Sequence, residues 1–336
     1  PPPRPPPPPP PPLLTRRQRQ LCISDRAGPP DEWDISRVYQ PTPSPRRRFQ
    51  RYNDPMSETR PFSLEMSDGR ELLGILHTPE RPGPRPTIVV CHGFKGFMEW
   101  GFFPHLAELL SERGFAVVRF NFTGAGMRPG DVLVTDTEAF RRATFSQDLR
   151  DLKRVVSALD REIGKGRIDL QKIGLFGHSR GGGIATLAAA QESWKNKIQA
   201  LVTWASVSTF DRASVDEKEI WRRRGYIPVV NSRTGQQLAI DAMVLEDLER
   251  LRRQLDPCAA GAARKAPWLI VHGDRDETVP VSEARLLAAQ AAAPCELRLI
   301  AGGDHTLGAK HPFDGPTPHL VEALNATQEW FRTHLG

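Results

Sequence analysis

From about residue 87 onward, short apolar runs alternate with segments whose apolar residues recur at helical spacing. The apolar runs cover residues 87–93, 115–122, 172–177, 198–206, 267–273 and 295–303. The helical segments cover residues 105–114, 148–160, 183–191, 282–293 and 319–335. This alternation predicts an α/β fold with a mostly parallel, doubly wound sheet flanked by helices. Reactive groups in such a sheet lie beyond the carboxyl ends of the strands, so the residues directly after each run are the site candidates.

Two strand-like runs, 62–66 and 70–78, precede this alternation. They are joined across Ser67-Asp68-Gly69, and an Asp-Gly turn between such runs predicts an antiparallel hairpin. We therefore expect one folded domain over residues 59–336.

The first part of the chain has a different composition. The first 60 residues hold 17 of the 32 prolines, including an unbroken run over 5–12, and eleven arginines against six acidic residues. Such a segment cannot bury enough apolar surface to fold, so residues 1–58 are predicted to be a disordered, proline-rich tail. The first methionine is Met56, and arginine outnumbers lysine 37 to 9, as in GC-rich genomes. We expect residues 1–55 to be dispensable and not translated; a ligand for proline-binding modules or a basic arm is the alternative.

Charge, hydropathy and cysteine spacing exclude several function classes. The net charge of +6 comes mostly from the tail, so the rest of the chain is nearly neutral and nucleic-acid binding is not expected. No apolar run is long enough to span a bilayer, and no signal peptide is present. The four cysteines are widely spaced and no HExxH motif occurs, which predicts reduced thiols, a cytoplasmic protein and no metal or other cofactor.

The apolar run at 172–177 ends in the sequence GHSRG at 177–181, a match to G-x-S-x-G. A sharp turn from strand to helix lifts such a serine above the sheet in a strained conformation, and the two glycines prevent clashes. A phosphate loop would need a Lys-Ser or Lys-Thr pair after its glycines, and this stretch has neither. We therefore interpret Ser179 as a catalytic nucleophile.

A nucleophile that attacks an acyl group needs hydrogen-bond donors for the oxyanion. The residues after the run at 87–91 are His92-Gly93-Phe94. The expected donors are the backbone N–H groups of Phe94 and of Arg180, the residue that follows the nucleophile. A plain strand-to-loop turn is the alternative for the first of these positions.

Serine at neutral pH also needs a general base, which a carboxylate orients. The runs at 267–273 and 295–303 are followed by candidates in the chain order nucleophile, acid, base. We assign His305 as the base and Asp276 as the acid, with Asp274 as its rival. His178, beside the nucleophile, is expected to be structural.

These four blocks together resemble the α/β-hydrolase superfamily over roughly residues 60–336. The segments HGFKGFMEWGFFPHLAELLSERGFAVVRFNFTG and GHSRGGG are similar to bacterial serine hydrolases labelled dienelactone hydrolase-like or prolyl oligopeptidase-like, and to cinnamoyl esterases. The resemblance implies the α/β-hydrolase fold, with Ser179, Asp276 and His305 as nucleophile, acid and base. It also implies that Phe94 and Arg180 form the oxyanion hole. Dienelactone hydrolases use cysteine as nucleophile, so that label does not carry a substrate with it.

Residues 207–265 lie where members of this superfamily carry a cap. We expect a helix at 217–225, a hairpin at 226–240 that turns near residues 233–235, and a second helix at 242–255. Trp221, Tyr226 and Met243 line an acyl pocket or, as we prefer, form the small core of the cap. The run Arg222-Arg223-Arg224 is expected to be a solvated face, and binding of an anionic substrate is the alternative.

These observations predict a serine hydrolase that cleaves small carboxylic esters through an acyl-enzyme. An amidase, peptidase or acyltransferase with the same triad is the alternative, and a non-catalytic binding protein on this fold is a weaker one. No nucleic-acid or membrane partner is expected, and the chain is either a monomer or a homodimer.

Overall fold

The computed structural model describes residues 57–194 and 196–336. They form an eight-stranded sheet in the order β1-β2-β4-β3-β5-β6-β9-β10. Strands β1 and β2 run antiparallel to their neighbours, and all other pairs are parallel. The strands are β1 (Ser57–Glu65), β2 (Glu71–Pro79), β3 (Arg85–Cys91), β4 (Ala116–Phe120), β5 (Ile168–His178), β6 (Ile198–Trp204), β9 (Trp268–Gly273) and β10 (Cys295–Ile300).

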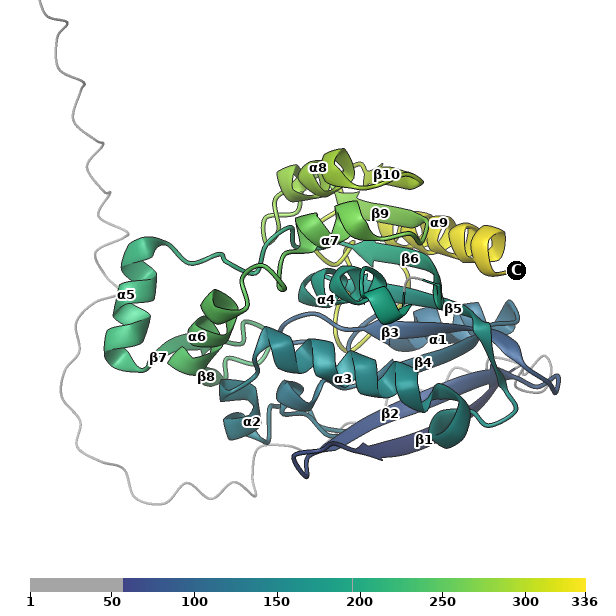
Figure 1. Cartoon of the computed structure of the whole chain (residues 1–336), viewed down its shortest axis with the longest axis horizontal. Helices are drawn as coiled ribbons and strands as arrows, with labels where there is room; N and C mark the ends of the chain where they lie inside the picture. Colours follow the sequence, from purple (N-terminus) through teal and green to yellow (C-terminus); the bar gives the residue numbers. More distant parts are fainter. Residues whose placement is uncertain (1–56, 195) are drawn as a thin grey trace, which may run out of the picture. The chain divides into compact units, whose positions relative to one another are not determined.

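Helices cover both faces of the sheet. Figure 1 shows α3, α4, α7 and α8 on the near face, with α1 and α9 behind the sheet. The helices are α1 (Phe103–Glu112), α2 (Thr137–Arg141), α3 (Phe145–Ala158), α4 (Arg180–Ala189), α7 (Pro257–Ala263), α8 (Val281–Gln290) and α9 (Pro318–Leu335). Single helical turns occur at Thr123–Ala125, Leu159–Ile163 and Glu192–Trp194. The mostly parallel, doubly wound α/β sheet expected from the alternation is therefore confirmed.

Alternation along the central strands explains why both faces are covered. Successive side chains of a strand point to opposite faces, and in β3 Ile88 and Val90 join one buried cluster while Val89 and Cys91 join the other. The first cluster also holds the apolar sides of α1 and α9, and the second holds those of α3, α4 and α8. Strands buried on both faces must be apolar throughout, which is the pattern of the sequence.

The predicted elements all have counterparts in the described residues, within a few residues at their ends. The hairpin of β1 and β2 begins at Ser57, two residues before the expected start of the domain at 59. Helices α2 and α7 were not expected, since each is too short for helical periodicity to be visible. The predicted disordered tail, apart from Ser57 and Glu58 in β1, lies outside the described residues.

The insertion between β6 and β9 contains two helices and a two-stranded hairpin, seen at the left of Figure 1. They are α5 (Val215–Arg224), β7 (Tyr226–Val230), β8 (Gln237–Asp241) and α6 (Ala242–Arg250). A capping box at Ser214 and Glu217 starts α5, and Gly225, with φ of 76°, ends it. The insertion ends before the expected residue 265, because α7 packs against α4 and α8 rather than against the hairpin.

Candidate active site

Ser179 lies at the turn between β5 and α4, with φ of 56° and ψ of −121°. A positive φ is unfavourable for a residue with a side chain, so the turn is held in a strained conformation by its surroundings. Its side chain lines a cavity of about 740 Å³. This is the place and the conformation that the G-x-S-x-G match predicted for Ser179.

The two glycines of the motif allow close approach of the backbone. A Cβ on Gly177 would lie 2.4 Å from the carbonyl oxygen of Gly181, and a Cβ on Gly181 would lie 2.4 Å from the carbonyl oxygen of His92. Any side chain at either position would force β5, α4 and the end of β3 apart. The tight strand-to-helix turn therefore depends on both glycines.

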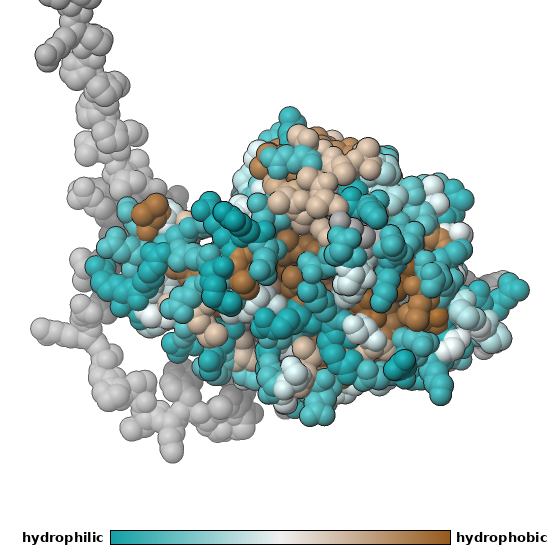
Figure 2. Space-filling view, viewed as in Figure 1, coloured by the Kyte–Doolittle hydropathy of each residue, from teal (hydrophilic) through white to brown (hydrophobic). Residues whose placement is uncertain are grey.

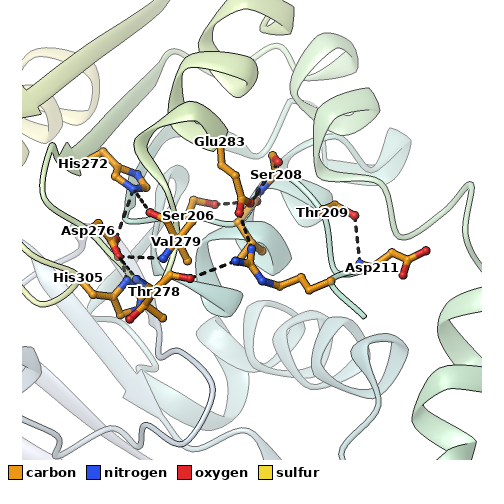
Figure 3. A network of polar contacts seen from close by, with 12 residues as sticks. Ser206, Ser208, Thr209, Asp211, His272, Asp276, Thr278, Val279, Glu283 and His305 are labelled. Atoms are coloured by element: carbon orange, nitrogen blue, oxygen red, sulfur yellow. Dashed lines mark hydrogen bonds and ion pairs between the residues drawn. The ribbon is translucent and has the colours of Figure 1, made fainter. Parts of the chain in front are cut away.

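His305 and Asp276 form a hydrogen-bonded pair. The Nδ1 atom of His305 lies 2.8 Å from Oδ2 of Asp276 (Figure 3). The carboxylate is fully buried, whereas the imidazole is 19% exposed and lines the same cavity as Ser179. Oδ1 of Asp276 also accepts the N–H groups of Thr278 and Val279, both at 2.8 Å. Asp276 thus fixes the orientation of His305, and the opposite ring nitrogen is left for the cavity.

The rival acid Asp274 and the neighbouring carboxylate Asp304 have other partners. Asp274 accepts the N–H of Gly302 at 2.7 Å, and Asp304 accepts those of Thr306 and Gly308. Both therefore stabilise the loops after β9 and β10, and neither of them contacts His305 through a side-chain hydrogen bond.

His272, at the end of β9, is a member of this cluster that the sequence interpretation did not include. Its Nε2 donates to the carbonyl of Val279 at 2.8 Å and lies 3.4 Å from Oδ2 of Asp276 (Figure 3). Burial raises the pKa of Asp276, but the hydrogen bonds from His272, His305 and the Val279 N–H outweigh it and hold the pKa below its ordinary value. His272 sits only four residues before Asp276, which is the one signal in the sequence.

His178 is placed as the sequence interpretation expected of a structural residue. Its Nε2 lies 2.9 Å from the carbonyl oxygen of His305, and its ring packs edge-on against Phe102. Burial and the neighbouring His305 lower the pKa of His178 to about 3. Since it is neutral, its ring N–H can hold the His305 backbone in place.

Phe94 and Arg180, the two residues predicted to form the oxyanion hole, both line the cavity that contains Ser179. Arg180 is the first residue of α4, and N–H groups in a first helical turn have no intrahelical acceptor. A Cβ on Gly93 would lie 3.1 Å from Cβ of Ser179, which brings the loop that contains Phe94 up against the serine. Among the described residues, the N–H groups of Phe94 and Arg180 make no backbone hydrogen bond of a turn, loop or helix cap.

The side chain of Arg180 points away from this position. Its Nε donates to Asp148 at 2.6 Å, its Nη2 donates to the carbonyl of Ala143, and its guanidinium stacks 4.3 Å from the ring centre of Phe145. Burial raises the pKa of Asp148 to about 6, although the charge of Arg180 acts in the opposite direction. Arg180 is therefore anchored by its side chain, which leaves only its amide beside Ser179.

The insertion contributes one wall of the cavity. Trp221, Asn231, Arg233 and Ile240 line it from the insertion, whereas Phe94 and Phe145 line it from the main domain. Figure 2 shows a largely hydrophilic face on which apolar surface is visible between the insertion, at the left, and the rest of the domain. The insertion thus forms part of the wall of the cavity that contains Ser179.

The three large side chains singled out in the insertion have different surroundings. Trp221 packs in a small cluster with Val244 and Leu245 and also lines the cavity. Met243 packs against that cluster but does not line the cavity. Tyr226 is 41% exposed beneath the guanidinium of Arg141. The expectation of a small cap core is therefore correct for Trp221 and Met243 and wrong for Tyr226.

A model of the Alpha/beta hydrolase family matches residues 88–316. The chain belongs to this family. The match spans β3 to the loop after β10 and so includes the serine turn, the Asp276–His305 pair and the insertion.

Three curated relatives show the range of proteins that this hydrolase is similar to. An uncharacterised 31.7 kDa protein of the traX-finO intergenic region of Escherichia coli is 25% identical, covering 81% of this chain and all of that protein. The uncharacterised peptidase YuxL of Bacillus subtilis is 27% identical, covering 74% of this chain and 35% of its own. The monoacylglycerol lipase of Mycolicibacterium smegmatis is 27% identical, covering 75% of this chain and 90% of the lipase.

Among solved structures, Est1E of Butyrivibrio proteoclasticus with bound ferulic acid superposes with a TM-score of 0.61. It is 23% identical, and the match covers 80% of this chain and 97% of that one. At this identity the likeness shows the shared fold.

Two further observations concern other kinds of site. No helix within residues 57–194 and 196–336 is long and apolar enough to cross a membrane. In the same residues, no three His, Cys, Asp or Glu side chains are grouped so as to hold a metal ion.

Proposed function

We propose that this hydrolase cleaves carboxylic esters through an acyl-enzyme formed on Ser179. The observation that carries the proposal is the 2.8 Å hydrogen bond between His305 and Asp276, with His305 and Ser179 on the wall of one cavity. A serine in a strained turn, an imidazole and an orienting carboxylate are the parts that acyl transfer requires.

In the first half of the reaction, the Ser179 oxygen attacks the ester carbonyl carbon while His305 takes the proton of the Ser179 hydroxyl. Asp276 holds the ring with Nδ1 protonated and stabilises the imidazolium that forms. The amides of Phe94 and Arg180 donate to the oxyanion of the tetrahedral intermediate. The bond to the alcohol then breaks, and His305 gives its proton to the departing alkoxide.

In the second half, water replaces the alcohol. The water oxygen attacks the acyl carbon while His305 takes a proton from the water. The same two amides hold the second oxyanion. The bond to Ser179 breaks, the serine recovers its proton from His305, and the carboxylic acid leaves. The enzyme returns to its starting state without any other reactant.

The cavity and the relatives support ester substrates of small size. A volume of about 740 Å³ lies within the range typical of small-molecule sites. The name of the related monoacylglycerol lipase also favours ester bonds. The free thiols of Cys91, Cys258 and Cys295 support the cytoplasm as the place of this activity.

Peptide or amide cleavage is the second candidate, because the relative YuxL bears the name of a peptidase. The same residues would serve, since only the leaving group differs. Matched ester and anilide substrates with one acyl group separate the two, and added alcohol or amine would reveal acyl transfer by its products.

The test of the proposal is a panel of short-acyl, long-acyl and aryl esters, assayed with the wild type and with Ser179→Ala. We expect hydrolysis of at least one class, and a loss in kcat of about 10⁴-fold or more in the variant. Full activity of Ser179→Ala would overturn the mechanism, and a protein that cleaves none of the esters would overturn the function.

A further inference from the structure

The charged residues that line the cavity are all of one sign. Five cationic side chains contribute to its wall, and among the described residues that line it none is Asp or Glu. Two of the five have carboxylate partners, since Arg180 pairs with Asp148 and Arg212 pairs with Glu283. The other three are Lys95, Arg233 and Lys310.

These three cations have no ion pair with any carboxylate of the described residues. Lys95 and Arg233 are half-buried, and their nearest polar contacts are the carbonyl oxygens of Val230 and Val132, at 3.2 and 3.4 Å. Burial lowers the pKa of both side chains, which reflects the cost of removing an unpaired cation from water. A bound anionic ligand would offset that cost.

The three cations gather where the hairpin of the insertion meets the main domain. Nζ of Lys95 donates to Val230, at the end of β7. Arg233, three residues further on in the hairpin turn, stacks 5.4 Å from the ring centre of Phe97. The same ring lies 5.1 Å from that of His311, the residue after Lys310. Loops after β3 and β10 and the hairpin turn therefore contribute one cation each to one side of the cavity.

An unpaired hydrogen-bond donor lies beside them. Asn231 lines the cavity and is 4% exposed, and its Nδ2 has no acceptor among the described residues. Its Oδ1 accepts the N–H of Arg233, which fixes the side-chain amide with the nitrogen as the free end. Buried donors without a partner are rare in folded proteins, so this nitrogen also calls for an acceptor from outside.

We propose that the substrate of this hydrolase is an ester that carries a carboxylate or similar anion, bound by Lys95, Arg233, Lys310 and the amide of Asn231. The inference rests on the proposed function, because it names the substrate class of the same site. Arginine and lysine bind carboxylates through charge-assisted hydrogen bonds, and Arg233 can do so with two parallel bonds.

Another side of the cavity is mostly apolar. Phe145, Phe210, Val207 and Trp221 line it, and all but Phe145 are less than 9% exposed. A substrate with one charged end and one apolar end fits both sides, with its ester group at Ser179. The anion belongs either to the acyl part or to the alcohol part.

Two matched pairs of esters distinguish an anion on the acyl part from one on the alcohol part. Methyl hydrogen adipate and methyl hexanoate differ only by a carboxylate in place of a methyl group on the acyl part. The para-carboxyphenyl and para-tolyl acetates differ in the same way on the alcohol part. We expect kcat/KM for the anionic member of one pair to exceed that of its neutral partner by about tenfold or more at low salt.

Charge-removing variants then test the named residues. Arg233→Gln and Lys310→Gln should each lower the ratio of anionic to neutral kcat/KM by about tenfold. Arg223→Gln is the matched control, since it removes an exposed arginine from α5 that does not line the cavity, and its ratio should equal that of the wild type. Unchanged ratios in Arg233→Gln and Lys310→Gln would overturn the assignment.

Binding to Ser179→Ala separates this inference from the proposed function. Calorimetry with methyl hydrogen adipate, methyl hexanoate and the two acetates should show tighter binding of one anionic ester than of its neutral partner. Preferential binding without hydrolysis by the wild type would overturn only the ester-cleaving function. Hydrolysis without any preference, in binding or in rate, would overturn only the anion site.

Discussion

The Nε atom of Arg180 lies 2.6 Å from Oδ2 of Asp148, and both side chains are largely buried beside the serine turn. This pair fixes the first residue of α4, directly after Ser179. Burial outweighs the attraction of Arg180 and raises the pKa of Asp148 to about 6, from an ordinary value of 3.8. The folded state therefore binds more protons than the unfolded state between these two pH values.

We expect this pair to give a measurable pH dependence of stability. The contribution of protonated Asp148 is complete below about pH 4 and is lost as the pH rises through about 6. Asparagine does not titrate, so the free energy of unfolding of the wild type, relative to Asp148→Asn, should fall across that window. Urea unfolding at a series of pH values measures it.

The control for this prediction is Asp160→Asn, at an exposed position after α3. It should follow the wild type at every pH. A difference between wild type and Asp148→Asn that is constant, or that grows with pH, would show that the pKa of Asp148 is not raised.

The choice between the two acids after β9 gives a second prediction. Asp276→Asn removes the charge that faces His305 and should lower kcat by about 10⁴-fold on any ester that the wild type cleaves. Asp274→Asn changes a neighbouring carboxylate that accepts the N–H of Gly302 and makes no hydrogen bond to His305, so its kcat should stay within a few-fold of the wild type. Similar losses in the two variants would contradict the assignment of Asp276.

His272 gives a third prediction, because it helps to keep Asp276 ionised. Without the N–H donor of His272, the pKa of Asp276 should rise. On acidification, the stability that the Asp276 carboxylate provides should then be lost at a higher pH. We expect His272→Leu to lower kcat/KM about 10- to 100-fold and to move the midpoint of acid unfolding to higher pH.

Glutamine at position 272 is the matched control, since its amide places a nitrogen near that of Nε2. His272→Gln should recover part of the rate and most of the resistance to acid unfolding. If the leucine and glutamine variants are equally impaired and the midpoint of acid unfolding is unchanged, His272 only fills space.

Much of the site could be predicted because it depends on local turns. Ser179, Asp276 and His305 lie one, three and five residues after the ends of β5, β9 and β10, and the parallel topology brings strand ends to one edge of the sheet. The positions of the turns in the insertion could be predicted for the same reason, because Gly225 ends α5 and Gly235 closes the turn of the hairpin.

The parts that could not be predicted depend on side chains that meet across the fold. The cations at Lys95, Arg233 and Lys310 come from three segments far apart in the chain, and only the placement of the hairpin brings them together. The contact of His272 with Asp276 depends on the direction of a buried side chain at the end of β9. Neither relation leaves a pattern of apolar spacing in the sequence.

The central claim is that Ser179 is the acylated nucleophile, and its most direct test is the mass of a trapped adduct. We predict that a fluorophosphonate adds one phosphonyl group to the wild-type protein with loss of fluoride, that peptide mapping places this group on Ser179, and that Ser179→Ala gains no mass. Equal labelling of Ser179→Ala, or a group mapped to another residue, would contradict the account.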